Sequence, residues 1–432
     1  MIEVVGDIDT LQSEPCNVAR RALVSRLLSK VTGDAVQRKL FADCGLVNAC
    51  KSVYSDPHLP TLKHVSSLIV ALSDCDEEAC RFGSALTLVR SRSGDGCEVF
   101  SKLKAEHREL SPRLFYIFRR LCEDQIALAI KEMSAPNMLR AQQIVQAISI
   151  DSFAICEMLP SLSVPVADMG ALINKCLQDN RDACSKVDLD TTCKEYLAIS
   201  RYFYRCLTSH RLNYHSSDWC LPPLLEICSI KHILPSDVVA DQYSLGLKKM
   251  KKMRPQGCAE VSSEIALRRP SVDGIRMNEM LLWHGCNADG IEQIISNGFD
   301  PRLAGMATAA MFGQGVYFAE HSSKCDFYSK PDPHDVRRML LVLVCLGNAF
   351  RTTASGKSWT MPPCSQCFKE RRKECQCNPK GTDFDAVSAV TKEDGGKVDF
   401  PEHVIYSNSQ ALPIAEISYK HISQCRCKEC RR

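Results

Sequence analysis

The sequence predicts a multidomain chain, with an all-α N-terminal part followed by an α+β part built on antiparallel sheets. Apolar residues recur at helical spacing up to about residue 230. From Met277 onward, short strand-like runs alternate with turns and irregular loops. Proline and glycine interrupt the helical periodicity between the two parts, over residues 231–275. The 432 residues give room for two or three domains of ordinary size.

The composition excludes several classes of protein. The 54 Lys+Arg against 51 Asp+Glu leave a net charge of +3, which argues against a protein whose main role is to coat nucleic acid. The hydrophobic content of 45% is ordinary for a folded globular protein. The longest apolar run, Met339–Leu346, is far shorter than the roughly 20 residues of a transmembrane helix. We therefore expect no membrane contact.

The 25 cysteines are the unusual feature of the composition. Their number is odd, and most stand singly in apolar segments, where a reduced thiol behaves as a small hydrophobic group. The acidic N-terminus has no apolar segment typical of a secretory signal. We expect reduced cysteines and an intracellular location, in the nucleus or the cytoplasm, rather than a disulfide framework.

Residues 1–230 read as a helical domain, with spacings such as Leu23 to Leu27. The segments Gly45–Asp56 and Ser84–Asp95 have similar patterns and begin 39 residues apart, near the period of about 40–47 residues in armadillo and HEAT repeats. An armadillo-like array and an irregular helical bundle both fit this pattern. We expect the domain to select protein partners, as extended helical arrays do.

Residues 231–275 are expected to connect the two parts, because Pro235, Pro255 and Pro270 break the helical pattern. The basic run Lys248–Arg254 fits a nuclear-import or phosphate-contacting patch. It also fits one solvated face of a helix whose methionines face inward. We favour the second interpretation, because the run lifts the net charge of the chain only to +3.

Residues 276–421 are expected to form the α+β domain. The strand-like runs are Leu281–Trp283, Gly315–Ala319, Arg337–Gly347, His403–Ser407 and Ala415–His421. The amphipathic run Asp289–Asn297 predicts a helix with Gly298 at its C-cap. Arg337–Gly347 does not alternate, which predicts a strand buried on both faces, whereas the last two runs alternate like antiparallel strands.

The segment Asn278–Gly285 (NEMLLWHG) places His284 and Gly285 at the end of a strand. Imidazole can bond a sugar hydroxyl, and a glycine leaves its backbone N–H and C=O open to a carboxamide. Taken alone, a histidine at a strand end is more often a satisfied polar group.

Two further segments carry candidate functional side chains. In Met311–Tyr328, a glycine-containing loop leads to Tyr317 and Tyr328, whose rings can sandwich a planar heterocycle. In Phe400–Ser407, Glu402 opens a strand, where a carboxylate can bind a ribose hydroxyl and stabilise positive charge on the sugar. Singly, each is more often a core or solvated residue; together and in this order they indicate a site.

The three motifs LLWHG, MFGQGVYFAEHSSK and FPEHVIYS, in that order, resemble the catalytic domain of poly(ADP-ribose) polymerases, and the middle one is similar to the tankyrase form. The resemblance covers residues 275 to 421, about a third of the chain. It implies the ADP-ribosyltransferase fold, in which two packed antiparallel sheets form a cleft for NAD+.

The resemblance also implies the roles of particular residues. His284 matches the histidine that bonds the adenosine ribose, and Gly285 matches the glycine that holds the nicotinamide carboxamide. Tyr317 matches the tyrosine of the His-Tyr-Glu set, and Tyr328 the second tyrosine that stacks on nicotinamide. Glu402 matches the catalytic glutamate. We therefore expect His284, Tyr317 and Glu402 to form the catalytic set.

A loop between the first two motifs, Gly298–Gly313, stands where the family has its donor loop. Phe299, Asp300 and Arg302 are candidates for adenosine contacts, and Ala319 is expected to line the NAD+ site.

Several positions depart from the family pattern. Cys325 stands where the family has a serine that bonds the nicotinamide amide, and a thiol is a weaker hydrogen-bonding group. Cys286 follows His284-Gly285 where serine is common, and Ala386 replaces a serine within Lys380–Ala389. These departures leave open a catalytically weak or inactive scaffold that binds NAD+ or ADP-ribose.

The resemblance implies an NAD+-dependent protein ADP-ribosyltransferase that releases nicotinamide and modifies protein acceptors. As nicotinamide leaves, the ribose becomes oxocarbenium-like, and Glu402 would stabilise that cation. An intact His-Tyr-Glu set permits poly- as well as mono-ADP-ribosylation. A further alternative is an enzyme activated by nucleic acid through the basic run or the cysteine cluster.

Seven cysteines cluster near the C-terminus. Four lie in a polar insert, 361–380, at CxxC and CxC spacing typical of a four-thiolate zinc site: Cys364, Cys367, Cys375 and Cys377. A metal would give this insert a reason to be ordered, since it has no core of its own. Three more lie in the tail, 422–432, and could form a second site or remain free thiols: Cys425, Cys427 and Cys430.

Overall fold

The structure is a computed structural model that divides into two compact units, Met1–Asp151 and Ser152–Arg432. The described residues are 2–13, 17–52, 59–90, 110, 117–118, 121–122, 139, 144, 164, 166–178, 182–208, 210–211, 219–220, 222–271, 273–303, 310–370, 383–392, 394–423, 425 and 427–430.

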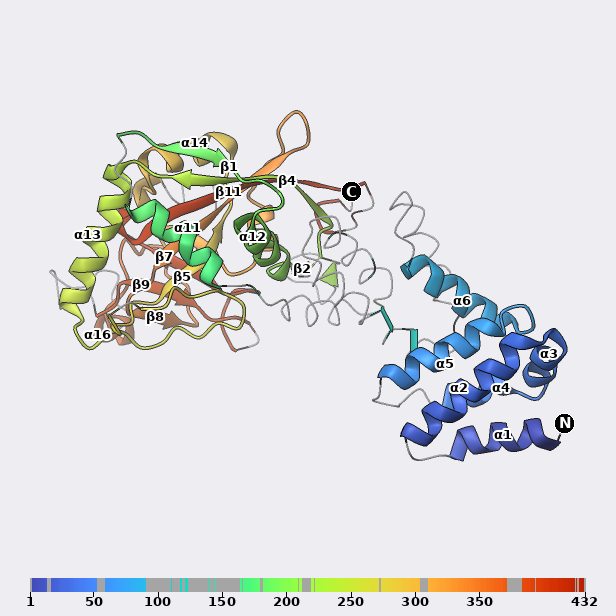
Figure 1. Ribbon diagram of the computed structural model, residues 1–432. Coiled ribbons are helices and arrows are strands. Elements are labelled where there is room, and N and C mark those ends of the chain that lie inside the picture. Colours follow the sequence, from blue (N-terminus) through green and yellow to red (C-terminus); the bar gives the residue numbers. More distant parts are fainter. Residues whose placement is uncertain are drawn as a thin grey trace. The chain divides into compact units, whose positions relative to one another are not determined.

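The first unit is helical, as expected (Figure 1, blue). Its described helices are α1 (Ile2–Ser13), α2 (Asn17–Gly33), α3 (Ala35–Asp43), α4 (Leu46–Ser52), α5 (Leu59–Ala71) and α6 (Glu77–Arg90). The predicted apolar stripes form its core, because Leu27 of α2 and Leu62 of α5 are fully buried. Asp34 caps α3 by accepting a hydrogen bond from Val36 N at 2.8 Å. The internal similarity at Gly45–Asp56 and Ser84–Asp95 runs partly into residues outside the described set.

The second unit combines helices with a large sheet. Its helices are α11 (Val166–Gln178), α12 (Lys194–Arg205), α13 (Asp237–Met253), α14 (Ala288–Asn297), α15 (Ser322–Asp326) and α16 (Ser365–Lys369), with 3₁₀ turns η3 (Pro301–Leu303) and η4 (Asn408–Gln410). Its strands are β1 (Ser185–Asp188), β2 (His210–Arg211), β3 (Trp219–Cys220), β4 (Leu225–Leu234), β5 (Glu279–His284), β6 (Val316–Ala319), β7 (Arg337–Cys345), β8 (Ala349–Thr352), β9 (Ala386–Ala389), β10 (Glu402–Ile405) and β11 (Ala411–His421).

The main sheet differs from the expected pair of packed antiparallel sheets. Its nine strands hydrogen-bond in the order β1-β4-β11-β7-β5-β6-β10-β9-β8. The strands β1, β4, β11, β7 and β5 are joined to β6, β10, β9 and β8 by one register pair between β5 and β6, Trp283 with Ala319. Strand β8 pairs parallel with β9. The five strand runs and the helix expected between residues 276 and 421 are confirmed as β5, β6, β7, β10, β11 and α14.

The long central strand β7 is buried on both faces, as its non-alternating sequence predicts. From Met339 to Cys345 no side chain is more than 1% exposed. On one face, Ile291 and Ile295 of α14 pack with Leu340 and Val342. Gly298 ends α14 with a φ of 79°, the left-handed conformation that favours glycine at a helix C-cap.

The second unit extends further toward the N-terminus than the expected boundary at residue 230. Strand β4 runs across that boundary and pairs with β11, and α13 lies within the expected connector, 231–275. A strand takes the place of the expected helix because the backbone of β4 pairs with β1 on one side and with β11 on the other.

The basic run lies on the last turns of α13. Lys248 and Lys249 are exposed and Met250 is buried, but Met253 is 57% exposed. Arg254 lies just beyond the helix and pairs with Asp385, with 2.6 Å from Nε to Oδ2. The run is therefore a solvated helix face on which one of the two methionines faces inward.

Candidate active site

Three residues that the sequence singles out share one face of the sheet. Glu402 opens β10 and pairs in register with Ala319 of β6, while Tyr317 pairs with Val404. Paired residues, and residues two apart along a strand, point to the same face. The backbone register therefore brings Tyr317, Ala319 and Glu402 together.

A lysine that the sequence analysis did not single out completes this group. Lys324, on the short helix α15 after β6, lies with its Nζ 2.6 Å from Glu402 Oε1. The two side chains are only 19% and 13% exposed. Burial lowers the pKa of Lys324, but the charges of Glu402 and Tyr328 outweigh it and hold that pKa above its ordinary value. Its place directly before Cys325 in the second motif is the signal that could have revealed it.

The two tyrosines have different surroundings. The Tyr317 hydroxyl accepts a hydrogen bond from Phe312 N at 2.8 Å and donates to Gly313 O at 3.0 Å, and burial raises its pKa to about 12. It therefore anchors the glycine-containing loop before β6. Tyr328 is 44% exposed, and burial of the rest of the side chain raises its pKa while Lys324 lowers it.

His284 ends β5 and is tied to β6. Its Nδ1 lies 2.9 Å from the Tyr317 carbonyl oxygen, and its ring packs against Phe299 and Phe318, at centroid distances of 5.2 and 5.6 Å. Because a carbonyl oxygen only accepts, Nδ1 carries the proton. Burial lowers the pKa of His284, so the ring is neutral at pH 7.

Gly285 is required by a close backbone approach to α15. A Cβ at this position would lie 2.2 Å from the carbonyl oxygen of Cys325. The Cys325 side chain is 4% exposed, and burial raises the pKa of its thiol well above the ordinary value. The thiol is neutral at pH 7, because burial raises its pKa more than the charge of Lys324 and the backbone hydrogen bonds with Ala319 and Gly285 lower it.

Comparisons with known proteins identify the family of this part of the chain. Residues 226–415 match the family described as Poly(ADP-ribose) polymerase catalytic domain. This part of the chain is a poly(ADP-ribose) polymerase (PARP) catalytic domain. The match begins in β4, well before the expected start at residue 276.

Individual relatives resemble shorter parts of the chain. A poly [ADP-ribose] polymerase 1 of Caenorhabditis elegans is 27% identical over 165 residues, which are 36% of this chain and 17% of the relative. The human protein mono-ADP-ribosyltransferase PARP14 is 36% identical over 77 residues, or 17% of this chain and 4% of the relative. A tankyrase of C. elegans is 35% identical over 72 residues, or 16% of this chain and 3% of the relative. The chain thus spans less than a fifth of the length of these relatives.

The segment Gly298–Gly313, which the resemblance predicts to be the donor loop, is described only at its ends. Arg302 is 87% exposed and pairs with Asp300, with 2.7 Å from Nη2 to Oδ2. Phe299 is buried beside His284. Residues 304–309 lie outside the described set, so the loop's contact with adenosine stays a prediction.

The zinc site expected in the insert also falls mostly outside the described residues. Cys364 is buried, but the side chain of Cys367 and both Cys375 and Cys377 are not described. That site stays a prediction. Among the described residues, no helix has the length and apolar character needed to cross a membrane.

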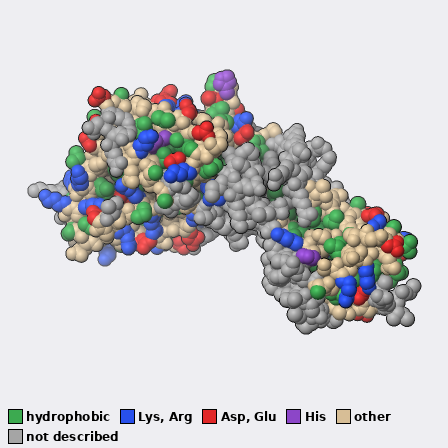
Figure 2. Space-filling view, in the orientation of Figure 1, with side chains coloured by type: hydrophobic (Ala, Val, Ile, Leu, Met, Phe, Trp, Pro, Cys, Tyr) green, Lys and Arg blue, Asp and Glu red, His purple; other side chains and the backbone are tan. Residues whose placement is uncertain are grey.

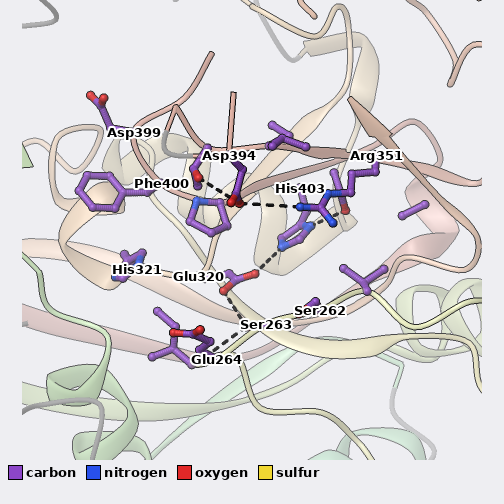
Figure 3. A pocket seen from close by; sticks show the side chains of 18 of the residues that line it. Ser262, Ser263, Glu264, Glu320, His321, Arg351, Asp394, Asp399, Phe400 and His403 are labelled. Atoms are coloured by element: carbon purple, nitrogen blue, oxygen red, sulfur yellow. Dashed lines mark hydrogen bonds and ion pairs between the residues drawn. The ribbon is translucent and has the colours of Figure 1, made fainter. Parts of the chain in front are cut away.

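A cavity of about 610 Å³, which the sequence analysis missed, lies on the face of the sheet opposite Glu402 (Figure 3). His403 follows Glu402 on β10 and therefore points to this other face. Its Nδ1 lies 2.9 Å from Ser388 Oγ and its Nε2 2.9 Å from Glu320 Oε1, and Ser263 Oγ donates to Glu320 Oε2 at 2.6 Å.

This buried chain of hydrogen bonds fixes β10 between β6 and β9. Burial alone would raise the pKa of Glu320, but the hydrogen bond and charge of His403 hold it below its ordinary value. None of the residues lining this cavity belongs to the predicted NAD+ set. We therefore assign the network a structural role: it fixes the backbone of β10, and with it Glu402, from the opposite face of the sheet.

Proposed function

We propose that the PARP domain transfers ADP-ribose from NAD+ to protein side chains and releases nicotinamide. The observation that carries the proposal is the largely buried pair of Lys324 and Glu402 beside Tyr317, inside the matched domain. A carboxylate held by a cation at the first residue of a strand, on the same face as an aromatic ring, suits a reaction that develops positive charge on a sugar.

The reaction breaks the bond between nicotinamide and the anomeric carbon, and the ribose becomes oxocarbenium-like. We assign Glu402 to the ribose 2′-hydroxyl, where its negative charge stabilises that cation. Lys324 keeps the carboxylate in a fixed orientation, so little reorganisation is needed as the reaction proceeds.

The remaining residues would hold the two ends of NAD+. With Nδ1 of His284 donating to Tyr317 O, its Nε2 is the ring atom left for the adenosine ribose. The backbone of Gly285 would hold the carboxamide, and Tyr317 and Tyr328 would flank the nicotinamide ring. Ala319 and Cys325 would line the same end, and Arg302 would act in the donor loop.

The length of the product is a separate part of the proposal. The relatives include proteins named as polymerases and proteins named as mono-ADP-ribosyltransferases, so similarity alone favours neither product. The set His284, Tyr317 and Glu402 supports chain elongation. We propose that the helical unit, whether armadillo-like or an irregular bundle, selects the protein acceptor.

Activation by nucleic acid is the weaker candidate. On the face seen in Figure 2, Lys and Arg side chains are interspersed with Asp and Glu rather than gathered into one basic patch. Arg254, at the end of the basic run, pairs with Asp385, which leaves fewer cations for phosphate.

The test is to incubate the full chain with labelled NAD+ and a mixture of proteins, and to resolve the products on a denaturing gel. A smear from the wild type supports polymer synthesis, and a sharp band from the wild type supports mono-transfer; in either case Glu402→Gln should leave only a faint trace of labelled product. The exposed Glu264→Gln serves as the matched control and should behave as the wild type. NAD+ binding without any transfer would contradict the proposal and favour a scaffold, with Cys325 as the suspected cause.

A further inference from the structure

We propose that His421, Cys425, Cys427 and Cys430 bind a structural zinc ion at the end of β11. The ligand atoms of these four residues all lie within 4.8 Å of one another. The sequence pattern pointed to the three cysteines, whereas it placed His421 only at the end of a strand. This inference rests on the geometry of the tail and is independent of the proposed transferase activity.

The distances fit a tetrahedral ion. With Zn–S near 2.3 Å and Zn–N near 2.0 Å, a tetrahedral site places nitrogen and sulfur about 3.5 Å apart. His421 Nδ1 lies 3.2 Å from Cys430 Sγ, 3.5 Å from Cys425 Sγ and 3.6 Å from Cys427 Sγ. One nitrogen thus faces three sulfurs at the spacing that a shared metal requires.

The local backbone supports the site. Turns close at Cys425 N to Ile422 O, 2.9 Å, and at Cys430 N to Cys427 O, 3.2 Å, and they bring the cysteines back toward the strand. Leu224 N donates to Cys425 Sγ at 3.3 Å, a contact that suits a thiolate ligand. Cys425 and Cys427 are 1% and 4% exposed and pack against Leu224.

The second nitrogen of His421 is held by a carboxylate. Nε2 lies 3.1 and 3.0 Å from the two carboxylate oxygens of Asp326, so Nε2 donates and the lone pair of Nδ1 faces the sulfurs. Asp326 also accepts from the Tyr419 hydroxyl at 2.9 Å and pairs with Arg337. Histidine ligands of zinc usually have their other nitrogen bonded to a carboxylate or a carbonyl in this way.

The donor set identifies the metal class and its role. Three sulfurs and one imidazole favour zinc over magnesium or calcium, which prefer oxygen ligands. Four protein ligands leave no open position for water, which indicates a structural ion rather than a catalytic one. Because Asp326 is the last residue of α15, the ion would tie the C-terminal tail to the helix that carries Lys324.

The test measures the zinc content of the full chain, expressed with zinc and freed of loosely bound metal. The variants are Cys425→Ser and Cys430→Ser, with Cys228→Ser, an exposed thiol on β4, as the matched control. Because the insert could hold another ion, the expected result is a difference: each tail variant loses about one zinc per chain relative to Cys228→Ser. An equal zinc content in all three would overturn the proposal.

A second measurement covers the case in which Cys425→Ser fails to fold. Cobalt(II) added to the zinc-free wild type should show the visible absorption bands of a tetrahedral thiolate site. Cys430→Ser should show weaker bands, because the cobalt in the tail site no longer contributes to them. Identical spectra would overturn the proposal, and so would a disulfide between tail cysteines in protein isolated without oxidation.

Discussion

Lys324 Nζ lies 2.6 Å from Glu402 Oε1, which joins the short helix after β6 to the first residue of β10. Each partner is supported from a different side. Behind Glu402, His403 bonds Glu320 and Ser388 on the opposite face of the sheet. Next to Lys324, Asp326 ends α15 in contact with His421 and Arg337. The pair is therefore held by two separate networks, both of which the fold provides.

Lys324→Met should weaken catalysis more than it weakens NAD+ binding. Removing the cation leaves the largely buried Glu402 carboxylate without its charged partner, and such hydrogen bonds contribute about 1.5–3 kcal/mol, or roughly 10- to 150-fold. We expect kcat to fall by about that factor in steady-state assays of nicotinamide release. Lys324→Arg keeps the charge and should retain part of the activity. A kcat equal to that of the wild type in Lys324→Met would show that the pair has no catalytic role.

Cys325→Ser should improve recognition of the nicotinamide end. A hydroxyl forms stronger hydrogen bonds than the neutral buried thiol, and one net hydrogen bond contributes about 0.5–1.5 kcal/mol, or roughly 2- to 12-fold. We expect the KM for NAD+ to fall within that range, and Cys286→Ser serves as the comparison. An unchanged or higher KM would mean that Cys325 does not touch the substrate.

Gly285→Ala should damage both stability and binding. The new Cβ would lie 2.2 Å from the Cys325 carbonyl oxygen, which forces β5 and α15 apart. We expect a loss of about 1–3 kcal/mol in denaturant unfolding and a weaker affinity for NAD+. Gly170→Ala in α11 is the matched control, since nothing lies within 4 Å of its Cβ position, and it should be neutral or slightly stabilising. Equal stability of the two variants would contradict the close approach.

His321 should make the second unit sensitive to acid. Burial lowers its pKa from about 6.5 to about 4, so the folded unit holds this ring neutral. The unfolded chain therefore binds a proton at this ring more readily than the folded unit does. The folded unit keeps its full stability above pH 6.5 and loses stability as the pH falls from about 6.5 to 4. The loss reaches about 3 kcal/mol, at about 1.4 kcal/mol per pKa unit.

Urea unfolding at pH 7 and at pH 4.5 measures this effect. His321→Asn should show a smaller difference in unfolding free energy between the two pH values than the wild type does. The comparison uses the difference between pH values, so a general loss of stability in the variant does not mimic the result. An unchanged difference would place the acid-sensitive group elsewhere.

The sequence predicted those parts of the fold that carry their own pattern. The run of β7 is apolar on both faces and needs no partner to be recognised, and Gly298 marks the end of α14 by itself. Strand β4 was missed because its residues become a strand only by pairing with β11, as Ile230 does with Ile417.

The site residues also divide into those with a local sequence signal and those whose role depends on tertiary contacts. The motifs revealed His284, Gly285, Tyr317 and Glu402, because each stands within a long recognisable segment. Lys324 was passed over, since a lysine is usually solvated and only the tertiary pairing with Glu402 gives it a role. His421 was missed for a similar reason, although the spacing H-x3-C-x-C-x2-C is a signal that could have found it.

The most direct test of Glu402 as the catalytic carboxylate is the rate of nicotinamide release from NAD+ by the full chain, compared between the wild type, Glu402→Gln and Glu264→Gln. We expect release by the wild type and by Glu264→Gln, and a loss of at least about 100-fold in Glu402→Gln, the scale of a group that stabilises developing charge. Release by Glu402→Gln at the wild-type rate would contradict the assignment of Glu402 as the catalytic carboxylate.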